Sequence, residues 1–195
     1  MDDVTDAIIH LDATALRVLA HPLRSRLLSE LRLHGPATAT ELADRLTTNT
    51  GATSYHLRKL ESVGLVSDTG TGEGKRRVWE AASRGHEWTP SDFVGDDDAE
   101  ASLSWLSRHY FTELEGWADR WFAAERTWTR AWRDALGYGD DGVHVTPAQA
   151  MAMREDIHQV VQKYRDAGRG RPDATDVMIW TILLPVGDPP REDRS

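Results

Sequence analysis

The residues best suited to chemistry are polar and basic side chains in two segments, residues 50–59 and 75–77. The first segment carries hydroxyl, imidazole and cationic groups, and the second is a Lys-Arg-Arg run that follows three closely spaced glycines. Hydroxyl and guanidinium groups donate hydrogen bonds to phosphates and to the edges of bases. The two segments therefore predict contact with a nucleic acid.

Motifs of catalysis and of metal binding are missing from the sequence. No G-x-S-x-G, P-loop, G-x-G-x-x-G or H-E-x-x-H pattern occurs, so we expect no enzyme, no catalytic residues and no cofactor. The chain has no cysteine, and the carboxylates near His144 and His158 lack the spacing of converging ligands, so we expect no metal. We interpret His21 and His56 as packing or phosphate-contact residues rather than general bases.

Residues 51–63 are predicted to form an amphipathic helix. Thr53, Leu57 and Leu60 share one stripe, with His56 half-turned beside it, and the opposite face is polar. Such a helix, when it follows a short capped helix and a tight turn, can place its N-terminal half in the DNA major groove. The predicted DNA-binding residues of both segments are Thr50, Thr53, Ser54, Tyr55, His56, Arg58, Lys59, Lys75, Arg76 and Arg77.

We expect a division of labour within this set. Ser54, Tyr55 and Arg58 are placed to read bases, whereas Thr50 and Lys59 suit phosphates, which fix the register without reading sequence. The basic run at residues 75–77 follows flexible glycines, so it can reach an adjacent minor groove or its backbone. That second segment is interpreted as a wing.

Local patterns define the elements that position these residues. Thr38 and Glu41 form a capping-box pattern, and Gly64 is the expected left-handed cap of the helix that follows. The predicted order is a helix at 14–20, a helix at 22–34, a short helix from 38, a helix at 51–63 and a hairpin with strands at 65–66 and 77–79.

Four segments between Leu16 and Trp79 carry a resemblance to a known family: LRVLAHPLRSRLLSEL, ATELADRL, TSYHLRKLESVGLV and GKRRVWEA. They resemble the winged helix-turn-helix domain of the ArsR-type transcriptional regulators, in their non-thiolate branch. The resemblance implies a homodimeric, sequence-specific DNA-binding regulator, expected to be a repressor, with residues 51–63 as recognition helix and 66–79 as wing. Metal sensing is not implied, because the metal-sensing members use cysteines. The resemblance gives DNA-contact roles to Ser54, Tyr55, His56, Arg58, Arg76 and Arg77.

Charge is distributed unevenly along the chain. The net charge is −9, yet residues 12–86 carry 11 Lys and Arg against 8 Asp and Glu, whereas residues 87–195 carry 12 against 21. A breaker-rich acidic stretch lies between the two regions. We therefore expect a boundary near residue 95, with a DNA-binding domain at 1–95 and a helical dimerisation and candidate effector domain at 96–195.

A long, tryptophan-rich helix is predicted between Glu100 and Leu136. Its apolar residues recur at alternating spacings of three and four, as in a seam between helices. A rod of about 50 Å is longer than a small domain covers by itself, so a second subunit is the expected cover. The competing hypothesis is an aromatic-lined pocket for a small apolar effector. The residues of this dimer or effector region are Tyr110, Trp117, Trp121, Trp128, Trp132 and Trp180.

The C-terminal part is predicted to be a strand-helix-strand unit. Its strands are expected at Val143–Val145 and Val177–Leu184, on either side of a helix from Thr146 to about Ala167. The expected fold class is therefore α+β and mostly helical, with a winged helix-turn-helix domain followed by a long helix and this unit.

The expected partner is double-stranded DNA, and the expected location is the cytoplasm. The opening residues lack the pattern of a secretory signal, and no apolar run is long enough to span a membrane. The alternative function is a protein-interaction module that keeps the winged-helix shape and docks a protein partner through its acidic C-terminal half.

Overall fold

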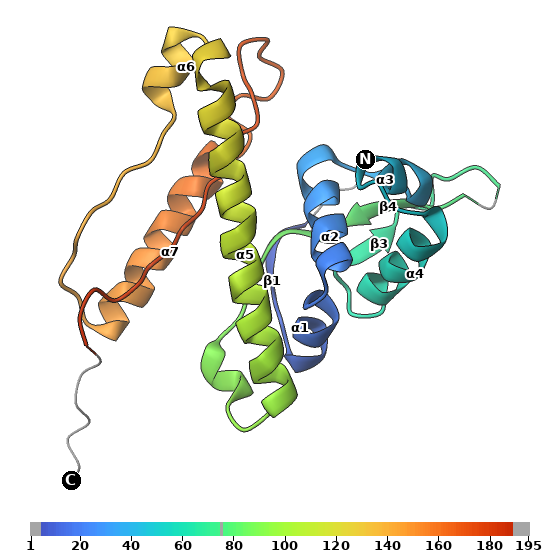
Figure 1. Ribbon diagram of the computed structural model, residues 1–195, viewed down its shortest axis with the longest axis horizontal. Coiled ribbons are helices and arrows are strands. Elements are labelled where there is room, and N and C mark those ends of the chain that lie inside the picture. The colour runs from blue at the N-terminus through green and yellow to red at the C-terminus, as the bar shows by residue number, and fades with distance from the viewer. Residues whose placement is uncertain (1–4, 75, 189–195) are drawn as a thin grey trace. The chain divides into compact units, whose positions relative to one another are not determined.

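The computed structural model describes residues 5–74 and 76–188. The chain divides into two compact units, Met1–Arg120 and Trp121–Ser195. The helices and the hairpin predicted before residue 80 all form, with bounds within two residues of those expected. In chain order this unit contains β1 (Thr5–His10), α1 (Ala13–Leu19), α2 (Pro22–His34), β2 (Ala37–Thr38), α3 (Ala39–Arg45), α4 (Thr50–Glu61), β3 (Val66–Asp68), β4 (Val78–Ala81), β5 (Ser83–Glu87), the 3-10 helix η1 (Pro90–Phe93) and most of α5 (Asp97–Ala124) (Figure 1).

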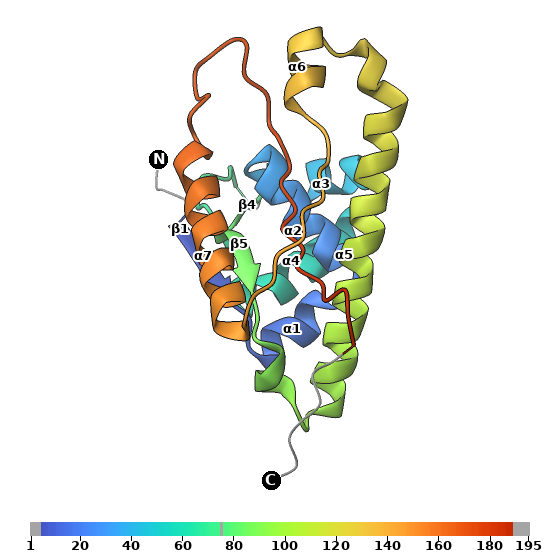
Figure 2. The same cartoon turned by 90° about the vertical axis from the view of Figure 1, so that its left-hand side faces the viewer.

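Two small sheets flank these helices. β3 and β4 are the antiparallel strands of the predicted hairpin, with Asp68 opposite Trp79, and β2 pairs with the other edge of β4. β1 and β5 pair in parallel, with Ile9 opposite His86 (Figure 2). β1 is not predicted from the sequence, because a parallel partner so far along the chain leaves no local pattern such as a hairpin turn.

The core of the first unit is built mainly from leucine. Buried leucines from α1, α2, α3 and α4 meet Trp79 of β4 and Phe93 of η1. Each such side chain contributes about 1.5–3 kcal/mol when it leaves water, so this core sets the angles at which the helices pack. The fully buried leucines are Leu11, Leu16, Leu19, Leu27, Leu28, Leu42, Leu57, Leu60, Leu65 and Leu106.

The first part of α5 belongs to the same core. Ala99 and Leu106 are fully buried. Asp96 accepts a hydrogen bond from the Ala99 N–H at 3.0 Å and pairs with Arg17 of α1 at 2.8 Å. Because this packing ties α5 to the preceding domain, the break between compact units falls after Arg120 and not near residue 95, where the acidic stretch indicates it.

A partly buried polar network joins α2, β5 and α5. The Arg32 guanidinium donates to the carbonyl and hydroxyl oxygens of Ser83 at 3.0 and 3.2 Å, and to His86 Nδ1 at 2.6 Å. An arginine has only donors, so Nδ1 is the unprotonated ring nitrogen, and Nε2–H donates to the Tyr110 hydroxyl at 2.6 Å. We call Arg32, Ser83, His86 and Tyr110 the Arg32 network.

Burial sets the protonation states in the Arg32 network. It lowers the pKa of His86 to about 3, and the charge of Arg32 acts in the same direction. Burial also lowers the pKa of Arg32 to about 10, and it raises the pKa of the Tyr110 hydroxyl above its usual value. At neutral pH the network therefore holds one cation, a neutral imidazole and a neutral phenol.

The second unit contains two short helices, one helix of 18 residues and long irregular segments. Beyond the end of α5 it comprises η2 (Glu125–Thr127), α6 (Arg130–Ala135) and α7 (Pro147–Tyr164). The predicted cap at Thr146 is confirmed, since its hydroxyl accepts from the Gln149 N–H at 3.3 Å. None of the described residues in this unit is buried. No helix in the described part of the chain is both long and apolar enough to span a membrane.

The α+β class is confirmed, but two expectations for the second half are wrong. The long helix ends at Ala124, because the Thr127 hydroxyl donates to the Ala124 carbonyl at 2.7 Å and Thr129 caps a new helix. The segments 143–145 and 177–184 are coil rather than strand (Figures 1 and 2). A strand needs a neighbour for its backbone hydrogen bonds, and no strand is formed among the described residues of this unit.

Candidate nucleic-acid interface

Polar caps orient the two helices of the helix-turn-helix, α3 and α4. The Thr38 hydroxyl accepts from the Glu41 N–H at 3.3 Å, and the Glu41 carboxylate accepts from the Thr38 N–H at 2.7 Å, which confirms the predicted capping box. Thr47, in the turn, has φ of 52°, a left-handed conformation that bends the chain sharply. Asn49 then accepts from the Ala52 N–H at 2.8 Å and begins α4.

The polar face of α4 is accessible over most of its length. Thr50, Arg58 and Lys59 are exposed, Ser54 is half-buried, and Tyr55 is 56% exposed. The Lys59 Nζ lies 5.8 Å from the centre of the Tyr55 ring, within the range of a cation–π contact. This face therefore presents both hydroxyl donors and cations.

A hollow of about 360 Å³ lies between α3, α4 and the wing, residues 66–79. Three arginines, Arg58, Arg76 and Arg77, are among its lining residues, together with the acidic residue Glu41. The hydrogen bonds from Thr38 hold the pKa of Glu41 below its usual range, so this carboxylate stays ionised. The contribution of α3 to this site was not predicted from the sequence. The lining residues from α3 and its cap are Thr38, Ala39, Thr40 and Glu41.

Thr53 is wrongly placed in the predicted DNA-binding set. Its side chain is fully buried, and its Oγ1 has no hydrogen-bond partner in the described structure. It lies on the same stripe as Leu57 and Leu60, which pack into the core. A buried side chain on this stripe cannot reach DNA.

Replacing Thr53 by valine is expected to raise the free energy of unfolding by up to about 1 kcal/mol. The two side chains have similar shapes, and the change removes a buried hydroxyl that makes no hydrogen bond. Urea denaturation measures the effect, with Thr50→Val on the exposed face as the matched control. If Thr53→Val has unchanged stability but no longer binds DNA, Thr53 contacts DNA and its assignment to the core is wrong.

His56 packs α4 against α2. Its ring centre lies 4.4 Å from that of His21, whose Nδ1 accepts from the Leu23 N–H at 3.2 Å. Burial lowers the pKa of both histidines, and the charge of Arg24 acts in the same direction. Both rings are therefore neutral at physiological pH, as a packing role requires.

The basic residues of the wing differ in their surroundings. Arg76 is exposed, whereas Arg77 lies 3.5 Å from a Glu61 carboxylate oxygen and 3.4 Å from an Asp68 carboxylate oxygen. Lys75, the third predicted contact, lies outside the described residues. Arg76 is thus better placed than Arg77 to meet a phosphate.

The predicted dimer or effector residues lie in different surroundings. Tyr110 belongs to the Arg32 network, and the Trp117 ring lies 4.4 Å from the Arg120 guanidinium carbon. In the second unit, Trp128 lies 6.3 Å from Trp121 and 6.1 Å from Trp132, measured between ring centres. Trp180 is half-buried. In the described parts of the chain, no group of three or more His, Asp or Glu residues could hold a metal ion.

Residues 19–69 match the family model described as "Helix-turn-helix domain". The match runs from the end of α1 through β3 and includes the helix-turn-helix of α3 and α4. The fold adds the β3–β4 hairpin directly after α4, so the class of fold is a winged helix-turn-helix domain. This match supports DNA-binding transcriptional regulation as the class of function.

Among solved structures, the chain is similar to reduced HlyU from Vibrio cholerae N16961. The identity is 24%, the TM-score is 0.32, and the alignment covers 50% of this chain and 85% of that one. No curated protein gives a significant match.

Proposed function

We propose that the protein is a sequence-specific, DNA-binding repressor of the ArsR type that acts as a homodimer. The observation that carries this proposal is the hollow between α3, α4 and the wing, where Arg58 and Arg76 meet hydroxyl groups from both helices. Guanidinium and hydroxyl donors in this arrangement suit phosphates and base edges. Ser54, Tyr55 and Arg58 read bases, and Thr50, Lys59 and Arg76 contact phosphates.

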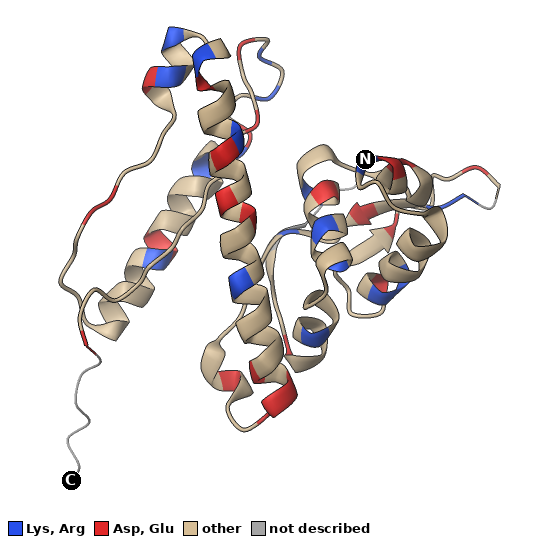
Figure 3. Cartoon of the chain, viewed as in Figure 1, with Lys and Arg blue, Asp and Glu red and all other residues tan. Residues whose placement is uncertain are grey.

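The local charge supports DNA as the partner despite the acidic chain. Residues 12–86 carry an excess of Lys and Arg, and Figure 3 shows basic positions on α4 and on the wing. A local positive surface attracts the phosphate backbone even when the net charge of the whole protein is negative. The acidic residues are concentrated after residue 86, outside the proposed interface.

A second copy of the chain is the proposed partner of the second half. The described residues of the second unit include no buried side chain, and an amphipathic helix gains most of its stability from packing. In a symmetric dimer, two recognition helices can address half-sites about 34 Å apart. The Trp121, Trp128 and Trp132 cluster is the proposed place for an apolar effector. Exposed large apolar residues here include Phe122, Tyr138, Met151, Val160, Tyr164, Ile179 and Leu184.

The alternative function is a winged-helix module that docks a protein. This alternative predicts that the second half covers the polar face of α4. Within the first unit, Tyr55, Arg58 and Arg76 are exposed, and this exposure suits DNA binding.

Selection from a random duplex pool, followed by mobility shifts at several salt concentrations, tests the proposed function. Arg76→Ala is expected to weaken binding to all duplexes and to lower the salt slope by about 1, because one phosphate contact is lost. Arg58→Ala is expected to relax the preference at one base position, at a cost of about 1–3 kcal/mol.

Arg126→Ala, which removes an exposed arginine from the second unit, is the control for the change in charge. It is expected to leave both the affinity and the base preference unchanged. Identical behaviour of the Arg58 and Arg76 variants would contradict the division of labour. Failure of the wild-type protein to enrich any duplex would remove the proposed function.

A further inference from the structure

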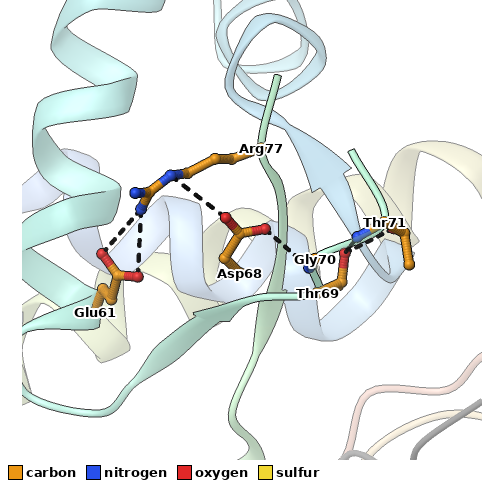
Figure 4. Close-up of polar contacts among 6 residues, drawn as sticks. All are labelled: Glu61, Asp68, Thr69, Gly70, Thr71 and Arg77. Carbon is orange, nitrogen blue, oxygen red and sulfur yellow. Dashed lines mark hydrogen bonds and ion pairs between the residues drawn. The ribbon is translucent and has the colours of Figure 1, made fainter. Parts of the chain in front are cut away.

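Arg77 joins three parts of the candidate interface. Its Nη1 lies 3.5 Å from Glu61 at the end of α4, and its Nε lies 3.4 Å from Asp68 at the end of β3 (Figure 4). The guanidinium carbon also lies 5.5 Å from the centre of the Trp79 ring in β4. One side chain thus connects the recognition helix to both strands of the wing.

The turn at the tip of the wing depends on the same carboxylate. Asp68 Oδ2 faces Arg77, while Oδ1 accepts a hydrogen bond from the Gly70 N–H at 3.1 Å (Figure 4). Gly70 has φ of 70°, and the Thr69 hydroxyl accepts from the Thr71 N–H at 3.2 Å. Asp68 therefore holds the first turn of the wing with one oxygen and Arg77 with the other.

We propose that Arg77 is a positioning residue that fixes the wing relative to α4, and that it is not a phosphate ligand. Its cationic group already faces two carboxylates, and it is half-exposed, so a phosphate would have to compete with both. Exposed ion pairs contribute little to stability individually, but a fork shared between two carboxylates restricts orientation. The wing is thereby held at one angle to the recognition helix, which decides whether Arg76 and Arg58 engage the same duplex.

Glu61→Gln separates the two roles of Arg77 because they predict changes of opposite sign. This inference rests on the proposed DNA binding. If Arg77 positions the wing, loss of the Glu61 charge loosens the wing and weakens binding to the selected duplex about 3- to 10-fold. If Arg77 contacts a phosphate, the same change frees the guanidinium, removes a negative charge near DNA and strengthens binding.

Arg77→Gln and Arg76→Gln complete the binding experiment. We expect Arg77→Gln to weaken binding as Glu61→Gln does, with the salt slope unchanged, and the double variant to be no weaker than either single variant. Arg76→Gln is the matched control, which should lower the salt slope by about 1. Stronger binding by Glu61→Gln, or a reduced salt slope in Arg77→Gln, would overturn the positioning role.

Amide hydrogen exchange in the free protein provides a readout that does not need DNA. The amides of residues 69–74 are expected to exchange faster in Glu61→Gln and Arg77→Gln and at the wild-type rate in Arg76→Gln. Unchanged exchange in the first two variants would overturn the inference. This result is independent of whether the wild-type protein enriches any duplex, so failure of the proposed function and failure of the positioning role are distinguishable.

Discussion

Replacing Arg32 by alanine is expected to lower the free energy of unfolding by about 2–4 kcal/mol. The change removes the donors that satisfy the Ser83 carbonyl and His86 Nδ1, and each buried acceptor left without a partner costs about 1–3 kcal/mol. Ser83 Oγ is affected less, because it keeps a hydrogen bond to the Gly85 carbonyl at 2.7 Å. Urea denaturation followed by circular dichroism measures the loss.

Arg26→Ala is the matched control for this prediction. Arg26 lies on the same helix but is exposed, and its replacement is expected to change stability by no more than about 0.5 kcal/mol. Arg32→Lys is expected to fall between the two, because an ammonium group cannot reproduce the planar fork that meets Ser83 and His86 together. Equal losses for Arg26→Ala and Arg32→Ala would show that the network contributes nothing to stability.

The same network explains how the core of the DNA-binding domain is connected to α5. Arg32 lies on α2, His86 on β5 and Tyr110 on α5, and the rings of Trp88 and Tyr110 stack with centres 6.1 Å apart. Charge-assisted hydrogen bonds are directional and strong. The N-terminal half of α5 is thereby fixed to α2, so a change in α5 can reach α2 through these contacts.

Much of the first unit could be predicted because its sequence patterns are local. The capping box of Thr38 and Glu41 and the left-handed cap at Gly64, which has φ of 72°, each act within a few residues. The β1 strand and the Arg32 network could not be predicted. Both depend on residues more than 50 positions apart, which only the folded chain brings together.

The candidate site was predictable as a surface but not in its details. Periodicity places Ser54 and Arg58 on the polar face of α4, and the structure agrees. Residue type alone was misleading for Thr53. Its hydroxyl suggested contact with DNA, but it lies on the apolar stripe of α4 and is buried in the core. The run of basic residues at 75–77 also does not reveal which of its arginines pairs with Glu61, and the structure shows that it is Arg77.

The second half was the least predictable because its patterns require partners. The apolar segment at residues 177–184 has the composition of a strand, but a strand forms only beside another. The long apolar seam stops at Ala124, where threonine hydroxyls compete for backbone groups. Periodicity alone cannot show such a competition.

Acidification from pH 6.5 to pH 5 is expected to destabilise the protein, with His86 as a main cause. In the folded protein the pKa of His86 is about 3, whereas a histidine in an unfolded chain has a pKa near 6.5. Below pH 6.5 the unfolded chain therefore binds a proton that the folded protein does not. Each pH unit costs about 1.4 kcal/mol once the unfolded histidine is protonated, until the folded histidine titrates near pH 3.

His21 and His56 add to this loss of stability on acidification, because burial lowers the pKa of both in the folded protein. Carboxylates with lowered pKa values, such as Asp96, lose their contribution at lower pH, so the window between pH 6.5 and pH 5 reports mainly on histidines. Denaturation midpoints across this window, measured at constant salt, give the slope of stability against pH.

His86→Gln is expected to reduce this slope by nearly one proton, although the variant is less stable at every pH. Tyr110→Phe is the informative comparison, because it removes the hydroxyl at Nε2 but keeps Arg32 at Nδ1 and leaves the imidazole buried. It should therefore retain most of the slope at a lower overall stability. Equal slopes in wild type and His86→Gln would mean that His86 has the same pKa in the folded and the unfolded protein. Burial and the charge of Arg32 would then not hold the imidazole neutral.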